Sequence, residues 1–160
     1  MGLDMYLRKR SHIFAEYDKD IAGTVKIVKG KKTIPVKLER ISEIIESVGY
    51  WRKANQIHKW FVDKVQKGVD DCGDYYVTLE QLQELLGACE TISKSKNNDV
   101  AMRLLPPQSG FFFGGSEVNE YYYEDIDLTI KILTPLIKEL KAEKKKDNGV
   151  SVSIYYHSSW

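Results

Sequence analysis

The amino-acid sequence predicts an α+β fold in which about four helices pack on a small antiparallel sheet. Three observations lead to this prediction. Segments with the strand period of two lie near both ends of the sequence, apolar residues at helical spacing fill the middle, and a Gly-Lys-Lys turn joins two further short strands. No internal repeat or long linker interrupts this order, so we expect residues 1–160 to form a single globular domain.

The predicted strands are an N-terminal strand, a hairpin and a C-terminal strand. Apolar and polar residues alternate over residues 3–7, and again over residues 24–29 and 33–38 on either side of the turn. Pro35 has no backbone N–H group to donate, which favours an edge position for the second hairpin strand. Alternation over residues 150–156 predicts the C-terminal strand.

Helices are expected between these strands. Isoleucine and valine at helical spacing predict a first helix over residues 41–48, and a second helix covers residues 49–61 and ends near Gly68. Thr78 followed by Gln81 has the pattern of a capping box, which predicts the start of a third helix.

The fourth predicted helix is the longest and covers residues 122–146. Pro135 lies inside it and is expected to kink the helix or to break it into two, because proline removes one helical hydrogen bond and clashes with the preceding turn. The three lysines at the end of this helix complement the negative end of the helix dipole.

Composition and charge argue against several classes of protein. The 24 basic and 23 acidic residues leave a net charge of +1, so no overall field would steer the protein to DNA, and any anion site must be local. We therefore expect no sequence-specific DNA binding.

No apolar run approaches about 18 residues, so we expect no membrane association and a cytoplasmic location. Cys72 and Cys89 lack metal-ligand spacing and are expected to be free thiols, with no metal or cofactor bound.

The most unusual segment covers residues 49–61 and combines aromatic rings, cations, an amide and an imidazole. On a helix, Trp51, Asn55 and His58 would share one stripe. Asn55 is the strongest candidate among them, because asparagine is a poor former of helix interiors unless its side chain bonds to something. The candidate ligand-binding residues of this segment are Tyr50, Trp51, Arg52, Asn55 and His58.

A second unusual segment contains a glycine-flanked Phe-Phe-Phe triplet followed by a Tyr-Tyr-Tyr triplet. The glycines allow positive φ angles and close approach of the backbone to a ligand. The tyrosines enter a predicted helix at its N-terminus, where an anion is favoured. The pattern is neither a Walker A loop nor a dinucleotide-binding fingerprint. This segment adds the candidates Gln108, Ser109, Phe111, Tyr122 and Tyr123.

Structural roles compete with these assignments. Aromatic side chains dominate core packing, so Trp60, Phe61 and at least one further ring are expected in the core. His58 is equally well explained as a buried, hydrogen-bonded histidine. The two aspartates that precede Cys72 suit a turn. A role for Cys72 as a nucleophile beside His58 would need a positioned base that the sequence does not reveal.

Several motifs together resemble a family of small uncharacterised proteins encoded by bacteriophages and prophages. They are the opening Met-Gly-Leu-Asp-Met-Tyr-Leu, the segment Gly-Tyr-Trp-Arg-Lys-Ala-Asn-x-Ile-His-x-Trp-Phe, Asp70-Asp71-Cys72, and Gln-Ser-Gly-Phe-Phe-Phe-Gly with the Tyr-Tyr-Tyr-x-Asp that follows. The resemblance implies an accessory phage protein made in the cytoplasm of the bacterial host. It implies no catalytic residues.

Three functions are compatible with these observations. The first is a binding protein that sequesters a small nucleotide-type ligand, such as a host immune signal, without turnover; Arg52 and Lys53 would contact phosphate. The second is a protein–protein inhibitor of a host defence enzyme, with the aromatic residues as an exposed interface. The third is a nucleotide hydrolase in which His58 acts with Asp71 or Asp125. A homodimer or higher homo-oligomer is compatible with each.

Overall fold

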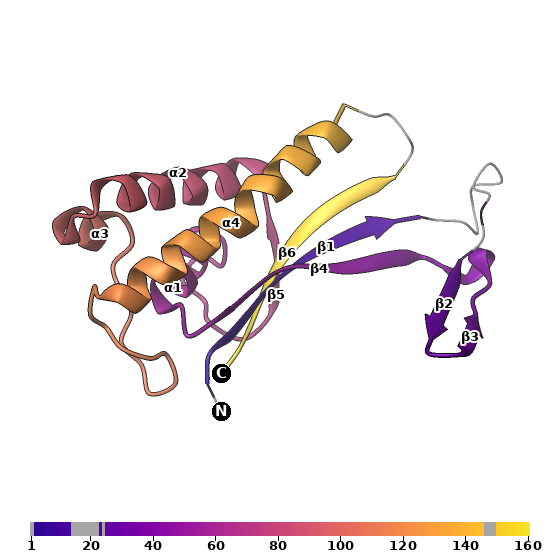
Figure 1. Ribbon diagram of the computed structural model, residues 1–160, viewed down its shortest axis with the longest axis horizontal. Coiled ribbons are helices and arrows are strands. Elements are labelled where there is room, and N and C mark those ends of the chain that lie inside the picture. Colours follow the sequence, from indigo (N-terminus) through magenta and orange to yellow (C-terminus); the bar gives the residue numbers. More distant parts are fainter. Residues whose placement is uncertain (1, 14–22, 24, 146–149) are drawn as a thin grey trace.

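The structure is a computed structural model that describes residues 2–13, 23, 25–145 and 150–160, and it has the predicted α+β fold (Figure 1). Along the chain the elements are β1 (Asp4–His12), β2 (Lys26–Lys29), β3 (Lys32–Pro35), the 3-10 helix η1 (Leu38–Arg40), β4 (Glu43–Arg52), α1 (Asn55–Lys64), β5 (Asp74–Val77), α2 (Leu79–Ser95), α3 (Asn98–Leu104), α4 (Glu120–Glu143) and β6 (Ser151–Ser159). Within the described ranges, no helix is long and apolar enough to span a membrane.

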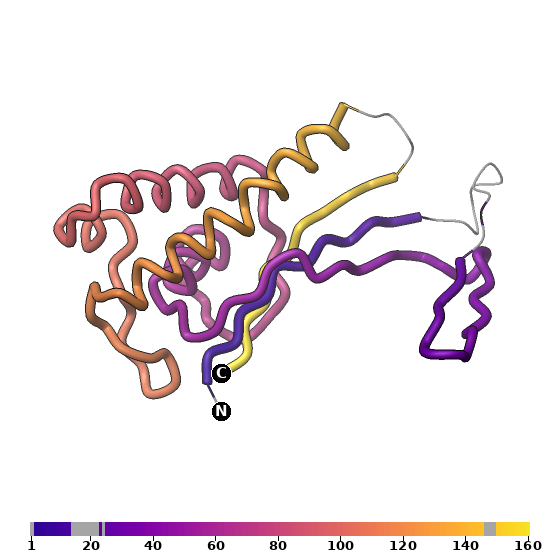
Figure 2. The backbone as a smooth tube through the Cα atoms, in the orientation of Figure 1, coloured from indigo at the N-terminus to yellow at the C-terminus, as the bar shows by residue number. Residues whose placement is uncertain are grey.

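The main sheet of the described residues is antiparallel and has the strand order β4-β1-β6-β5. Strands β1 and β6 pair along their whole length, from Asp4 opposite Ser159 to His12 opposite Ser151. The two ends of the chain therefore lie side by side at one end of the sheet (Figure 2). The predicted N-terminal and C-terminal strands are confirmed.

The predicted hairpin forms, but it is separate from the main sheet. In the described part of the chain, β2 and β3 pair only with each other, with Ile27 opposite Ile34. Pro35 ends β3, in agreement with its missing N–H group. Thr24, which the sequence assigned to the first hairpin strand, lies outside the described residues. In Figure 1 the hairpin lies at the far end of an arm formed by the main strands.

The helix predicted over residues 41–48 is wrong, because the chain there forms most of β4. Ile44 and Ile45 have the spacing of a helix face, yet they are 43% and 51% exposed and are not part of the buried core. Their β-branched side chains favour a strand, and the backbone hydrogen-bonds to β1 instead. A β-bulge shifts the register between Leu7 and Arg8.

The later helices follow the prediction more closely. The capping box of α2 is complete: Thr78 Oγ1 accepts from the Gln81 N–H, and Gln81 Oε1 accepts from the Thr78 N–H. Helix α4 continues through Pro135 without the predicted break, because this proline lies on the exposed side, where water can hydrate the carbonyl left unpaired. Strand β5 and helix α3 were not predicted.

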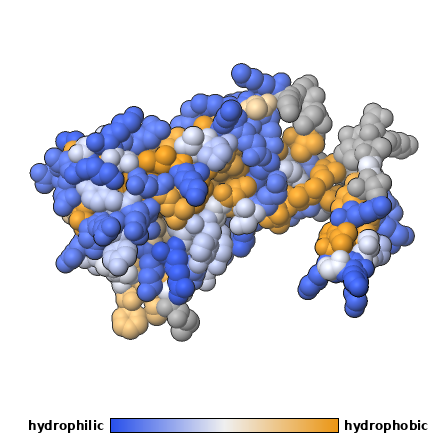
Figure 3. All heavy atoms as spheres, in the orientation of Figure 1, coloured by the Kyte–Doolittle hydropathy of each residue, from blue (hydrophilic) through white to orange (hydrophobic). Residues whose placement is uncertain are grey.

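The helices cover one face of the main sheet and enclose the core (Figures 1 and 2). Alternate residues of β1, β4 and β6 point into this core, while helices α2 and α4 pack on each other above it. The largest fully buried side chains are Leu3, Met5, Leu7, Trp51, Ile57, Phe61, Leu82, Leu85, Ile92, Leu105, Ile126 and Tyr156. Exposed aliphatic residues gather instead on the arm and the hairpin, where orange spheres lie among blue ones at one end of Figure 3.

Candidate functional site

The segment that contains most of the sequence candidates does not form one helix. Tyr50, Trp51 and Arg52 end strand β4, and α1 begins only at Asn55. Alternation along the strand turns Trp51 into the core, where it is fully buried and its Nε1 donates to Thr129 Oγ1 at 2.9 Å. Tyr50 and Arg52 are exposed. The stripe predicted from helical spacing is therefore not a surface of the protein.

His58 is fully buried and is hydrogen-bonded at both ring nitrogens. Its Nδ1 lies 2.7 Å from Tyr156 Oη, and its Nε2 lies 2.9 Å from Asp70 Oδ2. Trp160 Nε1 donates to the other oxygen of Asp70 at 3.2 Å, and the Phe113 ring meets the imidazole edge-on with centroids 5.2 Å apart. Burial raises the pKa of the Tyr156 hydroxyl well above its ordinary value. These contacts give His58 a structural role that joins α1 to β6.

Asn55 makes the hydrogen bonds that its sequence position suggested, but its partners are backbone groups of the glycine-rich loop. Its Nδ2 donates to the carbonyl oxygens of Phe113 and Gly115, at 3.0 and 2.7 Å. Its Oδ1 accepts from the Gln108 N–H at 2.9 Å. The side chain, only 2% exposed, thereby fixes the path of residues 108–115.

The phenylalanine triplet is divided between core and surface. Phe113 is buried, Phe112 is half-buried, and Phe111 is 97% exposed at the tip of the loop. Ser109 is also exposed. The three rings therefore do not act as one platform.

The tyrosine triplet is divided in the same way. Tyr122 is buried and its hydroxyl donates to the Leu105 carbonyl at 2.8 Å, while Tyr123 Oη donates to Asn98 Oδ1 at 2.9 Å. Tyr121 is 74% exposed. Burial raises the pKa of the Tyr122 hydroxyl. Two of the three hydroxyl groups are thus occupied in holding α3 and α4 together.

A pocket of about 550 Å³ opens where β4 ends, between the glycine-rich loop and the first turns of α4. Among the sequence candidates, Arg52, Asn55 and Tyr122 line it, whereas Trp51 and His58 do not. The other lining residues are Lys53, Gln56, Gly114, Gly115, Glu117, Asn119, Tyr121, Glu124 and Asp125. The volume lies within the range usual for small-molecule sites.

The turn between β4 and α1 shapes one side of this pocket. Lys53 has a φ of +60°, and its N–H donates to the Leu3 carbonyl at 2.8 Å. Gly114 faces this turn with a φ of +89°, and a Cβ added to it would lie 3.3 Å from Lys53 Cβ. Glycine is therefore required for the loop to approach the turn so closely. Arg52 and Lys53 give this side of the pocket two positive charges.

The first turns of α4 give the pocket a different wall. Burial raises the pKa of the Asp125 carboxyl to about 6, although Gln56 Nε2 donates to it at 3.2 Å, which opposes the shift. Glu124 lies beside it. Asn119 caps the helix by accepting the Tyr122 N–H at 3.2 Å. The pocket thus combines two cations with carboxylate and amide groups.

Sequence reasoning missed several lining residues, above all Gln56, Asn119, Tyr121 and Glu124. Asn119 carried a readable signal, because an asparagine directly before an amphipathic run is a common N-cap. Gln56 carried none, since its position on the pocket wall depends on where β4 ends.

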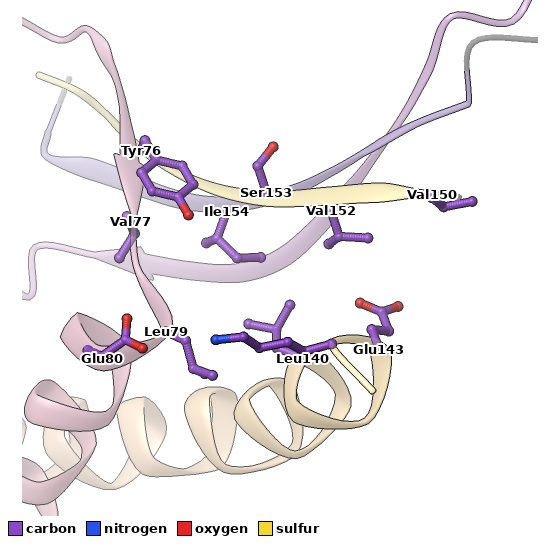
Figure 4. A pocket seen from close by; sticks show the side chains of 11 residues that line it. Tyr76, Val77, Leu79, Glu80, Leu140, Glu143, Val150, Val152, Ser153 and Ile154 are labelled. Carbon is purple, nitrogen blue, oxygen red and sulfur yellow. The ribbon is translucent and has the colours of Figure 1, made fainter. Parts of the chain in front are cut away.

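A second pocket, of about 280 Å³, lies between β6 and the last turns of α4 (Figure 4). Val152 and Ile154 point toward Leu140 of the helix, whereas Ser153 points away. Glu80 and Glu143 are its carboxylate groups. None of the sequence candidates lines it. Its volume is about half that of the first pocket and it contains no sequence candidate, so the first pocket is the better candidate site.

Comparisons with known proteins found no matching family, no matching curated protein and no matching solved structure.

Across the described ranges, no cluster of three or more histidine, cysteine or acidic residues could hold a metal ion. Cys72 and Cys89 are free thiols, and burial raises the pKa of Cys89.

Proposed function

We propose that the protein binds and sequesters a small nucleotide-type ligand in the pocket between the β4–α1 turn and α4. The observation that carries this proposal is the division of the pocket into two kinds of wall. Arg52 and Lys53 suit a phosphate, because cationic donors form strong charge-assisted hydrogen bonds with phosphate oxygens. Asp125 and Gln56 suit the amino and imino groups of a base.

A further feature supports a nucleotide. Tyr121 is 74% exposed at this pocket, so its ring is available to stack on a planar group. This ring alone would not define a site, but it is compatible with a base at the α4 wall.

We favour binding without turnover over hydrolysis because the described lining residues include no serine, threonine, cysteine or histidine, so Asp125 lacks the partner that the hydrolase hypothesis gives it. His58, the base of the hydrolase hypothesis, is buried outside the pocket with both ring nitrogens occupied. In the phage setting that the sequence motifs suggest, a binder of this kind would remove a host nucleotide signal from the bacterial cytoplasm.

The direct test is native mass spectrometry of the protein purified from phage-infected cells, followed by calorimetry with mononucleotides, cyclic dinucleotides and ADP-ribose. We expect one nucleotide class to bind and to be recovered intact by chromatography after prolonged incubation. Absence of any bound or binding nucleotide would refute the proposal, and recovery of a cleaved product would favour the hydrolase.

Variants localise the site. Arg52→Ala should weaken binding about tenfold to 100-fold, because a hydrogen bond to a charged group contributes about 1.5–3 kcal/mol. Lys138→Ala is the matched control, since it removes an exposed cation from α4 that does not line the pocket. Equal weakening by both variants would indicate a nonspecific charge effect.

A protein partner is the second candidate, and it is favoured by the apolar surface at the far end of the molecule (Figure 3). Five aliphatic side chains there are 43–64% exposed: Ile27, Val28, Ile34, Ile44 and Ile45. Exposed apolar patches often mark interfaces. Purification from infected cells should then return one stoichiometric partner, which Val28→Asp would release, and light scattering would show whether that partner is a second copy.

A further inference from the structure

The face of the main sheet opposite the helices carries aromatic rings and guanidinium groups. Cross-strand pairs place them in two adjacent rows, one made of Tyr50, Tyr6 and His157 and the other of Arg8, Tyr155 and Tyr76. The rows cross all four strands. A solvated sheet face needs only polar side chains, so four tyrosines in neighbouring register positions call for an explanation.

The rings form two contacting pairs. The centroids of Tyr6 and Tyr50 are 5.4 Å apart, and those of Tyr76 and Tyr155 are 6.0 Å apart. Tyr50 and Tyr76, on the two edges of the sheet, are 46% and 57% exposed. Each pair therefore has one ring held within the sheet and one ring open to a ligand.

Two arginines lie among these rings. The guanidinium carbon of Arg8 is 5.5 Å from the Tyr6 ring centroid, and that of Arg10 is 4.2 Å from the Tyr155 centroid. Both arginines are ion-paired with Asp74, Arg8 at 3.8 Å. One carboxylate faces two guanidinium groups, so this part of the face keeps a positive charge that a phosphate could neutralise.

The other described carboxylates of this face are not ion-paired with Arg8 or Arg10, and Glu43 lies 4.0 Å from His12 Nδ1 instead. His157 Nδ1 lies 3.1 Å from the same Asp74 carboxylate. Asp4 accepts a hydrogen bond from Tyr50 Oη at 2.5 Å, and it stands opposite Arg52 in the β1–β4 pairing. The positive charge therefore lies beside the rings.

We propose that this face binds single-stranded nucleic acid without sequence preference, with bases stacked on Tyr50 and Tyr76 and phosphates at Arg8 and Arg10. Rings on a sheet and adjacent cations are the general means by which single strands are held, because every base has a π-face. Four strands about 4.8 Å apart span about 14 Å, so Tyr50 and Tyr76 on the two edge strands can hold separate bases of one strand. The site shares none of these four residues with the nucleotide pocket and does not depend on it.

The test is fluorescence anisotropy with labelled 12-nucleotide oligo-dT and oligo-U, and with a 12-base-pair duplex for comparison. We expect both single strands to bind more tightly than the duplex. Raising salt from 50 to 200 mM should weaken binding roughly sevenfold, as two phosphate contacts to a single strand predict. Failure of both single strands to bind at 200 mM or below, or tighter binding of the duplex, would overturn the proposal.

Ring variants separate stacking from charge. The double variant Tyr50→Ala, Tyr76→Ala should bind oligo-dT at least tenfold more weakly, because each stacked ring contributes about 1–3 kcal/mol. The double phenylalanine variant keeps the stacking surface and should stay within about twofold of the parent protein. Phe111→Ala is the control, because it removes a 97% exposed ring elsewhere. Unchanged binding by the double alanine variant, with a native circular dichroism spectrum, would refute the stacking role.

Discussion

Replacing Asp125 by asparagine should make the protein more stable and its ligand binding weaker. In the folded protein, burial holds the pKa of this carboxyl at about 6, against an ordinary value of 3.8. Above pH 6 the carboxylate is ionised in both folded and unfolded chains, so the folded state carries the cost of burying its charge. Asparagine removes that charge and can still accept the hydrogen bond from Gln56.

The magnitude follows from the two pKa values. Their difference corresponds to about 3 kcal/mol, at about 1.4 kcal/mol for each pKa unit. Asp125 is only partly buried, so solvent screening reduces the expected gain at pH 7.5 to about 1–2 kcal/mol. Between pH 3.8 and 6 the folded chain binds more protons than the unfolded one, so the cost of burying Asp125 becomes smaller as the pH falls. The advantage of Asp125→Asn should therefore shrink toward zero near pH 4.

Urea denaturation of both proteins at pH 7.5 and pH 4.5 measures this difference. Asp127→Asn is the matched control on the same helix. Asp127 is exposed, asparagine can still accept the hydrogen bond from Ser93, and the exposed ion pair with Lys96 contributes little, so the unfolding free energy should change by less than about 1 kcal/mol at either pH. If Asp125→Asn is neutral at pH 7.5, or equally stabilising at both pH values, the burial argument is wrong. A gain in stability with a loss of nucleotide affinity would mark Asp125 as a ligand-binding group.

Three further substitutions test the core and its caps by chemical denaturation. Thr129→Val removes the acceptor of the buried Trp51 N–H and should cost about 1–3 kcal/mol; a cost below about 0.5 kcal/mol would show that the indole finds another partner. Thr78→Ala removes the cap of α2 and should cost about 1 kcal/mol, and an unchanged midpoint would contradict the capping role. Gly49→Ala places a Cβ 2.9 Å from Ile132 Cγ2 and should cost about 1–3 kcal/mol, unless α4 shifts freely.

The parts of the fold that were predictable from sequence are those set by local chemistry. The capping box at Thr78 and the alternation of the terminal strands depend on neighbouring residues alone, and both were confirmed. The segment 41–48 was misassigned because its isoleucines have helical spacing. Ile44 and Ile45 are exposed, so this spacing does not mark the buried face of a helix. Their β-branching was the signal that favoured a strand.

The candidate site was predictable only in outline. Two sequence candidates, Arg52 and Asn55, line the pocket, but the side chain of Asn55 also bonds backbone that lies more than 50 residues away in the chain. No local pattern carries that contact. The ring face was hidden for a related reason: Tyr6 and Arg8 could be assigned to a polar strand face, but their neighbours Tyr155 and Tyr76 follow only from the register of pairing.

The position of β6 in the sheet has a consequence for how the chain folds during synthesis. It is an inner strand between β1 and β5, yet among the described elements it follows β1, β4 and β5 in the chain and leaves the ribosome after them. Until then, β1 can pair with β4, but β5 has no neighbour and the core lacks Tyr156 and the partner of His58. Until β6 pairs with it, one edge of β1 is free to pair with other chains. Folding should therefore depend on contacts between residues that are far apart in the sequence.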